Sequence, residues 1–282
     1  MEKITAGYVR EHLPPRDPMG HKGTFGRVAV LGGAVGYTGA PVYAGEAAAR
    51  CGSGLVYAAV PREVYPIIAS RCETTMAFPV PEDYPALLER LLSMDACAIG
   101  PGLGRGPETD ARTRKLLCDL PLPVVLDADG INAAAEHIDS LREREAPTIV
   151  TPHEGEFLRL GGDLSLGREE AAQRMAELLG CILVLKGPET VVASPEGRLM
   201  VNTNGNCGMA KGGSGDVLTG MVLSLLGQGA EPFEAAAAAV WLHGRAGDLC
   251  ARELTAYAMT PADMLRKLPA VFGELLSLDG TH

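Results

Sequence analysis

The sequence predicts an α/β protein with a central, mostly parallel sheet flanked by helices on both faces. Short runs rich in β-branched residues alternate with longer helical patterns, as in repeated strand–helix–strand units. The strand candidates are apolar on both faces, as parallel strands between two helical layers are. A chain of 282 residues that is 46% hydrophobic and rich in Ala, Gly and Val also suits a large α/β domain.

The elements follow one another in a regular order along the chain. The expected parallel strands are residues 27–33, 54–60, 96–100, 123–128, 148–152 and 181–187. Helical patterns lie between them, with clear examples at residues 39–51, 109–120 and 168–179. Residues 190–202 resemble a hairpin that turns around Pro195, Glu196 and Gly197, and the pattern is mainly helical after Gly215.

Composition excludes several classes of partner. The net charge is −10 and no basic run occurs, which argues against nucleic acid and anionic membranes. No run approaches the ~20 apolar residues of a membrane span, and the first residues lack an apolar signal core. Seven cysteines are scattered singly without a CxxC pair, so reduced thiols in the cytoplasm are expected.

Most of the predicted strands end in a loop that contains glycines or acids. Examples are "GGAVGYTGA", "GPGLGRG", "DADGIN", "TPHEGE" and "KGPET". In open parallel sheets, ligands bind beyond the carboxyl ends of the strands. These loops therefore predict one shared ligand site along that rim.

The stretch "GGSGD", from Gly212 to Asp216, precedes an apolar helical pattern. It fits neither a Walker A loop nor a GxGxxG fingerprint. Glycines let successive N–H groups converge on an anion at a helix start. Asp216 then has two interpretations, which spacing alone leaves open. It stabilises the helix dipole, by ~0.3–1 kcal/mol, or it is a general base beside an anion hole.

The same stretch resembles the G-x-G-D motif of the ribokinase-like kinases. Together with "HKGTFGRVAVLGGAVGYTGAPVYAGEAAARCGSGLV", "AIGPGLGR", "LDADGIN", "TPHEGEF" and "LVLKGPETVV", it is similar to the ADP/ATP-dependent NAD(P)H-hydrate dehydratases. The resemblance spans roughly residues 21–268. It implies a single ribokinase-like dehydratase domain over residues 1–282, without the epimerase domain fused to some relatives.

The family implied by this resemblance restores hydrated NADH and NADPH, in the S form, at the expense of a nucleotide. A phosphoryl group passes to the ring hydroxyl and then leaves as phosphate. Asp216 matches the base, and Gly213, Ser214 and Gly215 match the anion hole. The positions that match the nucleotide-binding segment are Lys186, Gly187, Pro188, Glu189, Thr190 and Gly215. ADP is expected as phosphoryl donor rather than ATP.

The resemblance also implies substrate and metal positions. Ala40, Gly104, His153 and Asp216 match contacts to the hydrated dinucleotide, and Glu156 is the candidate that orients Mg²⁺ through water. Helix capping is the competing interpretation of His153 and its neighbour. A homotetramer is expected from the relatives. Other acids and bases are less clearly assigned: Asp127, Asp129, Asn132, Lys22 and His243.

Two alternatives keep the same scaffold. The first is a kinase of a small vitamin-precursor alcohol, in which Asp216 has the same role; the "HKGTFGRV" and "KGPET" stretches favour the dehydratase. The second is a non-enzymatic nucleotide sensor. The intact "GGSGD", with a lysine and an acid nearby, argues against it.

Overall fold

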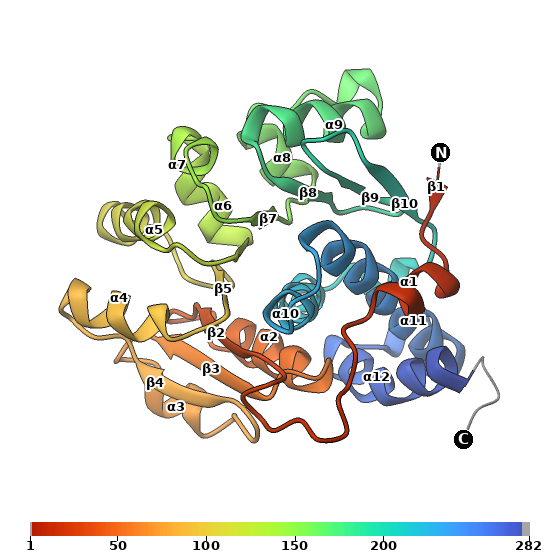
Figure 1. The fold of residues 1–282 in the computed structure, drawn as a ribbon, viewed down its shortest axis with the longest axis horizontal. Helices are drawn as coiled ribbons and strands as arrows, with labels where there is room; N and C mark the ends of the chain where they lie inside the picture. The colour runs from red at the N-terminus through yellow and green to blue at the C-terminus, as the bar shows by residue number, and fades with distance from the viewer. Residues whose placement is uncertain (1, 278–282) are drawn as a thin grey trace.

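The computed structural model describes residues 2–277, in which one sheet lies between two layers of helices (Figure 1). The strand order is β1-β10-β9-β8-β7-β6-β5-β2-β3-β4. All neighbours are parallel except β9, which runs antiparallel to β8 and to β10. The predicted fold class and the hairpin are therefore confirmed.

The strands are short, as expected for strands covered by helices. Their bounds are β1 Glu2–Lys3, β2 Arg27–Leu31, β3 Leu55–Val60, β4 Met76–Pro79, β5 Ala96–Ile99, β6 Val124–Leu126, β7 Thr148–Val150, β8 Ile182–Leu185, β9 Thr190–Ala193 and β10 Leu199–Asn202. The six predicted parallel strands all occur, each one to three residues shorter than expected. The edge strands β1 and β4 were missed.

The helices connect these strands and continue after them. Their bounds are α1 Ala6–His12, α2 Gly39–Arg50, α3 Tyr65–Ala69, α4 Tyr84–Leu92, α5 Pro107–Asp119, α6 Ala128–Ala135, α7 Asp139–Arg142, α8 Glu154–Arg159, α9 Arg168–Leu179, α10 Ser214–Gly227, α11 Pro232–Ala258 and α12 Pro261–Leu276. Among these helices, none is long and apolar enough to cross a membrane.

The two faces of the sheet pack against different helices. In β2, Val28 and Val30 join the core beneath α2, α10 and α11, whereas Ala29 and Leu31 join the core beneath α4, α5 and α9. All four side chains are nearly inaccessible. The strand is therefore apolar on both sides, as the sequence predicted.

Helix α10 is buried along its length and approaches α2 very closely. A Cβ added to Gly220 would lie 2.0 Å from the carbonyl oxygen of Ala44. The apolar stretch 217–226 and the alanine-rich stretch 235–242 of α11 lie in the core of this layer. Helices α2 and α10 are thereby packed closely against each other.

This contact predicts opposite effects of the same substitution in two helices. Gly220→Ala should destabilise the fold by about 1–3 kcal/mol, because the new methyl group meets backbone. Gly273→Ala in α12, where nothing lies within 4 Å of the added Cβ, should stabilise it by about 0.5–1 kcal/mol. Urea unfolding measures both. A Gly220→Ala protein as stable as wild type would show that α2 and α10 are not this close.

Candidate active site

The carboxyl ends of β6, β7 and β8 meet the first turns of α10 at a buried carboxylate. Asp127, directly after β6, is 2% exposed. Its Oδ1 accepts hydrogen bonds from Thr151 Oγ1 at 2.8 Å and from Lys186 Nζ at 2.9 Å. Its Oδ2 accepts one from Thr219 Oγ1, on α10, at 2.7 Å. Four elements are therefore joined at one side chain.

Helix α10 begins without a side-chain cap. Gly213 precedes it with a φ of 100°, and a Cβ there would lie 2.9 Å from the ring of Tyr43. Only glycine fits this conformation and this contact. Because no side chain caps the first turn, its N–H groups can bind an anion. This geometry is compatible with the anion hole expected at Gly213, Ser214 and Gly215, which stays a prediction.

His243 of α11 supports the same helix start. Its Nε2 lies 2.9 Å from the carbonyl oxygen of Ser214, and burial lowers the pKa of the imidazole to about 4. The ring is therefore neutral and donates to this carbonyl. His243, which the sequence analysis left unassigned, is thus a packed helix residue.

Asp216 lies in the first turn of α10, and its side chain keeps some contact with solvent. Burial, and after it the charge of Asp127, raise its pKa to about 7 against the opposing charge of Lys186. Near neutral pH this carboxyl group is partly ionised and readily exchanges a proton. A pKa close to the working pH is the property that a general base needs.

Lys186, directly after β8, is the cation of the site. Burial alone would lower its pKa, but Asp127 and Glu156 outweigh that effect and raise it. Its Nζ lies 3.7 Å from Glu156 Oε2, and a Cβ on Gly215 would lie 3.5 Å from the same nitrogen. A charged ammonium group is therefore held beside the start of α10.

His153 and Glu156 cap helix α8 reciprocally. The backbone N–H of His153 donates to Glu156 Oε2 at 2.8 Å, and that of Glu156 donates to His153 Nδ1 at 3.2 Å. Helix capping, the competing interpretation from the sequence, is thus what the structure shows. The imidazole is still 55% exposed, so contact with substrate stays a prediction. Glu156 is buried, with its carboxylate between His153 and Lys186.

The predicted nucleotide segment forms the loop between the antiparallel strands β8 and β9. Gly187, Pro188 and Glu189 are exposed, and Thr190 Oγ1 donates to the Gly187 carbonyl oxygen at 3.1 Å. Arg168 of α9 supports the base of the loop, because its Nη2 donates to the Leu185 and Lys186 carbonyl oxygens. The loop therefore projects into solvent from a fixed base.

The predicted substrate loops lie next to each other on the same rim. A Cβ on Gly102 would lie 2.9 Å from Ala40 Cβ, and one on Gly104 would lie 3.3 Å from Ala34 Cβ. Gly104 N–H donates to Asp129 Oδ2 at 2.9 Å. Asp129 thus binds the neighbouring loop, and no side chain caps the start of α6. Lys22 is exposed in its loop.

Sequence reasoning missed Thr151 and Thr219 and left Asp127 unassigned. Each threonine donates to Asp127. The available signal was an acid placed directly after a buried strand, because such a group needs partners. Nothing in the local sequence identified those partners.

An uncapped helix start, a carboxyl group of near-neutral pKa and a lysine lie together on the rim of a ribokinase-like α/β fold, an arrangement suited to phosphoryl transfer. A solved ribokinase-like superfamily protein of Enterococcus faecalis matches with a TM-score of 0.88 and 28% identity, over 98% of this chain and 96% of that one. The NAD(P)H-hydrate dehydratase family model matches residues 28–270, and the chain belongs to this family.

Individual relatives agree with that assignment. The bifunctional NAD(P)H-hydrate repair enzyme Nnr of Moorella thermoacetica is 44% identical over 96% of this chain and 54% of its own. The ADP-dependent (S)-NAD(P)H-hydrate dehydratase of Bacillus subtilis is 35% identical over 95% of this chain and 96% of its own. A crystal structure is known for the ADP/ATP-dependent NAD(P)H-hydrate dehydratase of B. subtilis co-crystallised with ATP/Mg²⁺. It matches with a TM-score of 0.85 and 34% identity, over 97% of this chain and 98% of that one.

The raised pKa of Asp216 predicts a pH-dependent cost to stability. In the folded chain the carboxyl keeps its proton up to about pH 7, whereas an unfolded aspartate loses it near ~3.9. Unfolding therefore releases a proton between these values, and the free energy of unfolding falls as pH rises through this window. Asp216→Asn should unfold like wild type near pH 4. Above pH 7 it should be more stable by about 1 kcal/mol, allowing for partial exposure.

Urea unfolding at pH 4.5 and pH 8 measures this difference. Asp139→Asn is the matched control, because Asp139 also lies in a first helical turn but is exposed. If Asp216→Asn is no more stable than wild type at pH 8, burial does not destabilise the ionised carboxylate of Asp216.

Proposed function

We propose that this protein dehydrates the S form of hydrated NADH and NADPH, with ADP as phosphoryl donor. The observation that carries the proposal is Asp216, a carboxyl group with a pKa of about 7 beside an uncapped helix start and a charged lysine. The family and the names of its relatives support the substrate class. The chain spans about half the length of the M. thermoacetica relative, so that protein's full activity is not carried over.

In the first step, Asp216 takes the proton of the ring hydroxyl. The oxygen attacks the β-phosphorus of ADP, a bond to phosphorus forms, and AMP leaves. The N–H groups of Gly213, Ser214 and Gly215 and the Nζ of Lys186 stabilise the charge on the transferred group. Asp216 must be ionised to act, so its pKa sets the lower pH limit of the reaction.

In the second step, phosphate leaves where hydroxide could not, because it is the better leaving group. The lone pair of the ring nitrogen pushes it out, and the adjacent ring carbon loses a proton, which restores the dihydronicotinamide. The products are NADH or NADPH, AMP and inorganic phosphate. The step needs no redox partner.

The donor nucleotide would lie against Lys186 and the loop from Gly187 to Thr190. Mg²⁺ would neutralise phosphate charge there. Glu156 fits a contact through water rather than direct ligation, because its oxygens already face His153 and Lys186. Among residues 2–277 no group of three metal-ligating side chains occurs, which suits an ion held mainly by phosphate oxygens.

We further propose that residues 1–282 act as one dehydratase domain in the cytoplasm. One sheet incorporates every described strand, from β1 to β10, which supports this proposal. A homotetramer is proposed only from the resemblance. The apolar stretches 217–226 and 235–242 pack inside the chain, so any interface uses other surfaces.

The test is recovery of reduced nicotinamide. The protein is mixed with hydrated NADH, Mg²⁺ and either ADP or ATP, and the near-ultraviolet absorbance is followed. Absorbance should return only with nucleotide, and faster with ADP. No return with either nucleotide would contradict the proposal and favour a kinase of a small vitamin-precursor alcohol.

Asp216→Asn should fold and bind ADP but lose at least about a hundredfold in kcat, because general base catalysis contributes ~10²–10⁴. Calorimetry with ADP and the absorbance assay separate binding from turnover. Asp139→Asn should keep wild-type kcat. Wild-type kcat in Asp216→Asn would show that another group removes the proton.

A further inference from the structure

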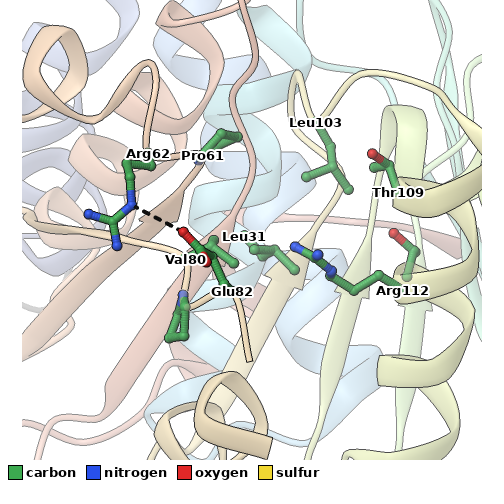
Figure 2. Close-up of a pocket in the computed structure, with 10 residues that line it drawn as sticks. Leu31, Pro61, Arg62, Val80, Glu82, Leu103, Thr109 and Arg112 are labelled. Carbon is green, nitrogen blue, oxygen red and sulfur yellow. Dashed lines mark ion pairs between the residues drawn. The ribbon is translucent and has the colours of Figure 1, made fainter. Parts of the chain in front are cut away.

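Lys211 directly precedes the GGSGD motif, yet the reaction proposed above gives it no role. A cavity of about 240 Å³ on the same rim, lined by Leu31, Leu103 and Arg112 among others, does not include it either (Figure 2). A lysine beside a glycine-rich helix start would suit a phosphate ligand. The contacts of its side chain indicate a different role.

The ammonium group of Lys211 binds the main chain at the end of α11. Its Nζ donates to the carbonyl oxygens of Tyr257 at 2.7 Å and of Met259 at 2.5 Å. Carbonyl groups at a helix C-terminus lack intrahelical partners and favour a cation. Two of the three donors of the ammonium group are therefore occupied by backbone, which leaves only one for a phosphate oxygen.

The segment that Lys211 holds, residues 255–261, is here called the α11–α12 junction. Within it, Thr255 has a φ of 66° and a ψ of 158°. Glycine adopts this conformation readily, whereas a β-branched residue avoids it. Such a strained residue persists only where the surrounding contacts hold it. The two carbonyl groups that Lys211 binds lie shortly after Thr255 and supply contacts of this kind.

The junction also touches the start of α10. A Cβ added to Gly213 would lie 3.1 Å from Pro261 Cγ. The main-chain carbonyl oxygen of Lys211 accepts a hydrogen bond from the N–H of Ser214 at 3.2 Å, and such a bond at a helix end can be shared with an anion. Lys211 therefore binds the junction through its side chain and the first residue of α10 through its backbone.

We propose that Lys211 is a positioning residue for phosphoryl transfer, an inference that rests on the proposed function. By holding the strained junction, it fixes the place of Gly213 and Ser214 relative to Asp216. It acts through the backbone that it anchors and not by contact with the transferred group. Phosphoryl transfer depends on such positioning, because a misplacement of about 1 Å can cost ~10²-fold in rate.

Substitutions of Lys211 test its donors. Lys211→Met keeps the length of the side chain and should lower kcat about tenfold, with unchanged Kd values for ADP and for hydrated NADH in calorimetry. Lys211→Arg should keep most of the activity, because its forked donors can reach two carbonyl oxygens. Lys267→Met is the matched control, because Lys267 joins α12 to α11 through Glu253, outside the junction. It should keep wild-type kcat.

Thr255→Gly tests whether Lys211 acts through the junction. Glycine adopts the observed conformation without strain, so the junction should depend less on Lys211. In this background Lys211→Met should lower kcat only about threefold, because the two effects are coupled. An equal loss with Thr255 and with glycine would show that Lys211 does not act through the junction, and would overturn the proposal.

Proteolysis reports on the junction without any turnover. Tyr257 is 95% exposed, and chymotrypsin cleaves after it when the backbone opens locally. Lys211→Met should speed this cleavage about tenfold, whereas Lys267→Met should be cleaved like wild type, as measured by mass spectrometry of the fragments. If wild type recovers no reduced nicotinamide, the proposed reaction fails, while the cleavage rates still decide whether Lys211 holds the junction.

Three further results would overturn the proposal. The first is wild-type kcat or wild-type cleavage in Lys211→Met. The second is a Lys211→Arg protein as slow as Lys211→Met. The third is weaker ADP binding in Lys211→Met with unchanged cleavage, which would make the ammonium group a direct phosphate ligand.

Discussion

The buried carboxylate of Asp127 is the contact on which the geometry of the site depends. A charge in the interior is costly unless it is paired and hydrogen-bonded. Its partners come from the ends of β7 and β8 and from α10, so satisfying one side chain fixes three other elements. Lys186 is thereby held beside the start of α10, and the charge of Asp127 also helps to raise the pKa of Asp216. Asp127 thus both joins the elements of the site and contributes to the raised pKa of Asp216.

Close backbone approach is the second constraint. Gly100, with a φ of 125°, would place a Cβ 1.8 Å from the carbonyl oxygen of Asp127. The β5–α5 loop can therefore lie against the end of β6 only because this residue is glycine. Gly213 has the same role where α10 meets Tyr43. These glycines of the rim are thus required by packing.

The sequence predicted those parts of the fold that local patterns encode. Two-sided apolar runs marked the central strands, and the glycine-acid motif marked the start of α10. Strand β1 was not predicted from the sequence, because it has only two residues and depends on β10 for pairing. The partners of Asp127 lie 24, 59 and 92 residues away, so no spacing could show them. The capping role of His153 was underrated, because histidine is not a usual N-cap residue.

The connection between β8 and β9 differs from its neighbours. The parallel central strands β2, β5, β6 and β7 lead into covering helices, whereas β8 turns back directly into β9. The exposed residues from Gly187 to Glu189 therefore connect two paired strands, and Arg168 supports the loop at its base. Surface loops of this kind tolerate insertion and exchange. The tip of this turn can therefore change in length or sequence without moving Lys186 at its base or Asp216 on α10.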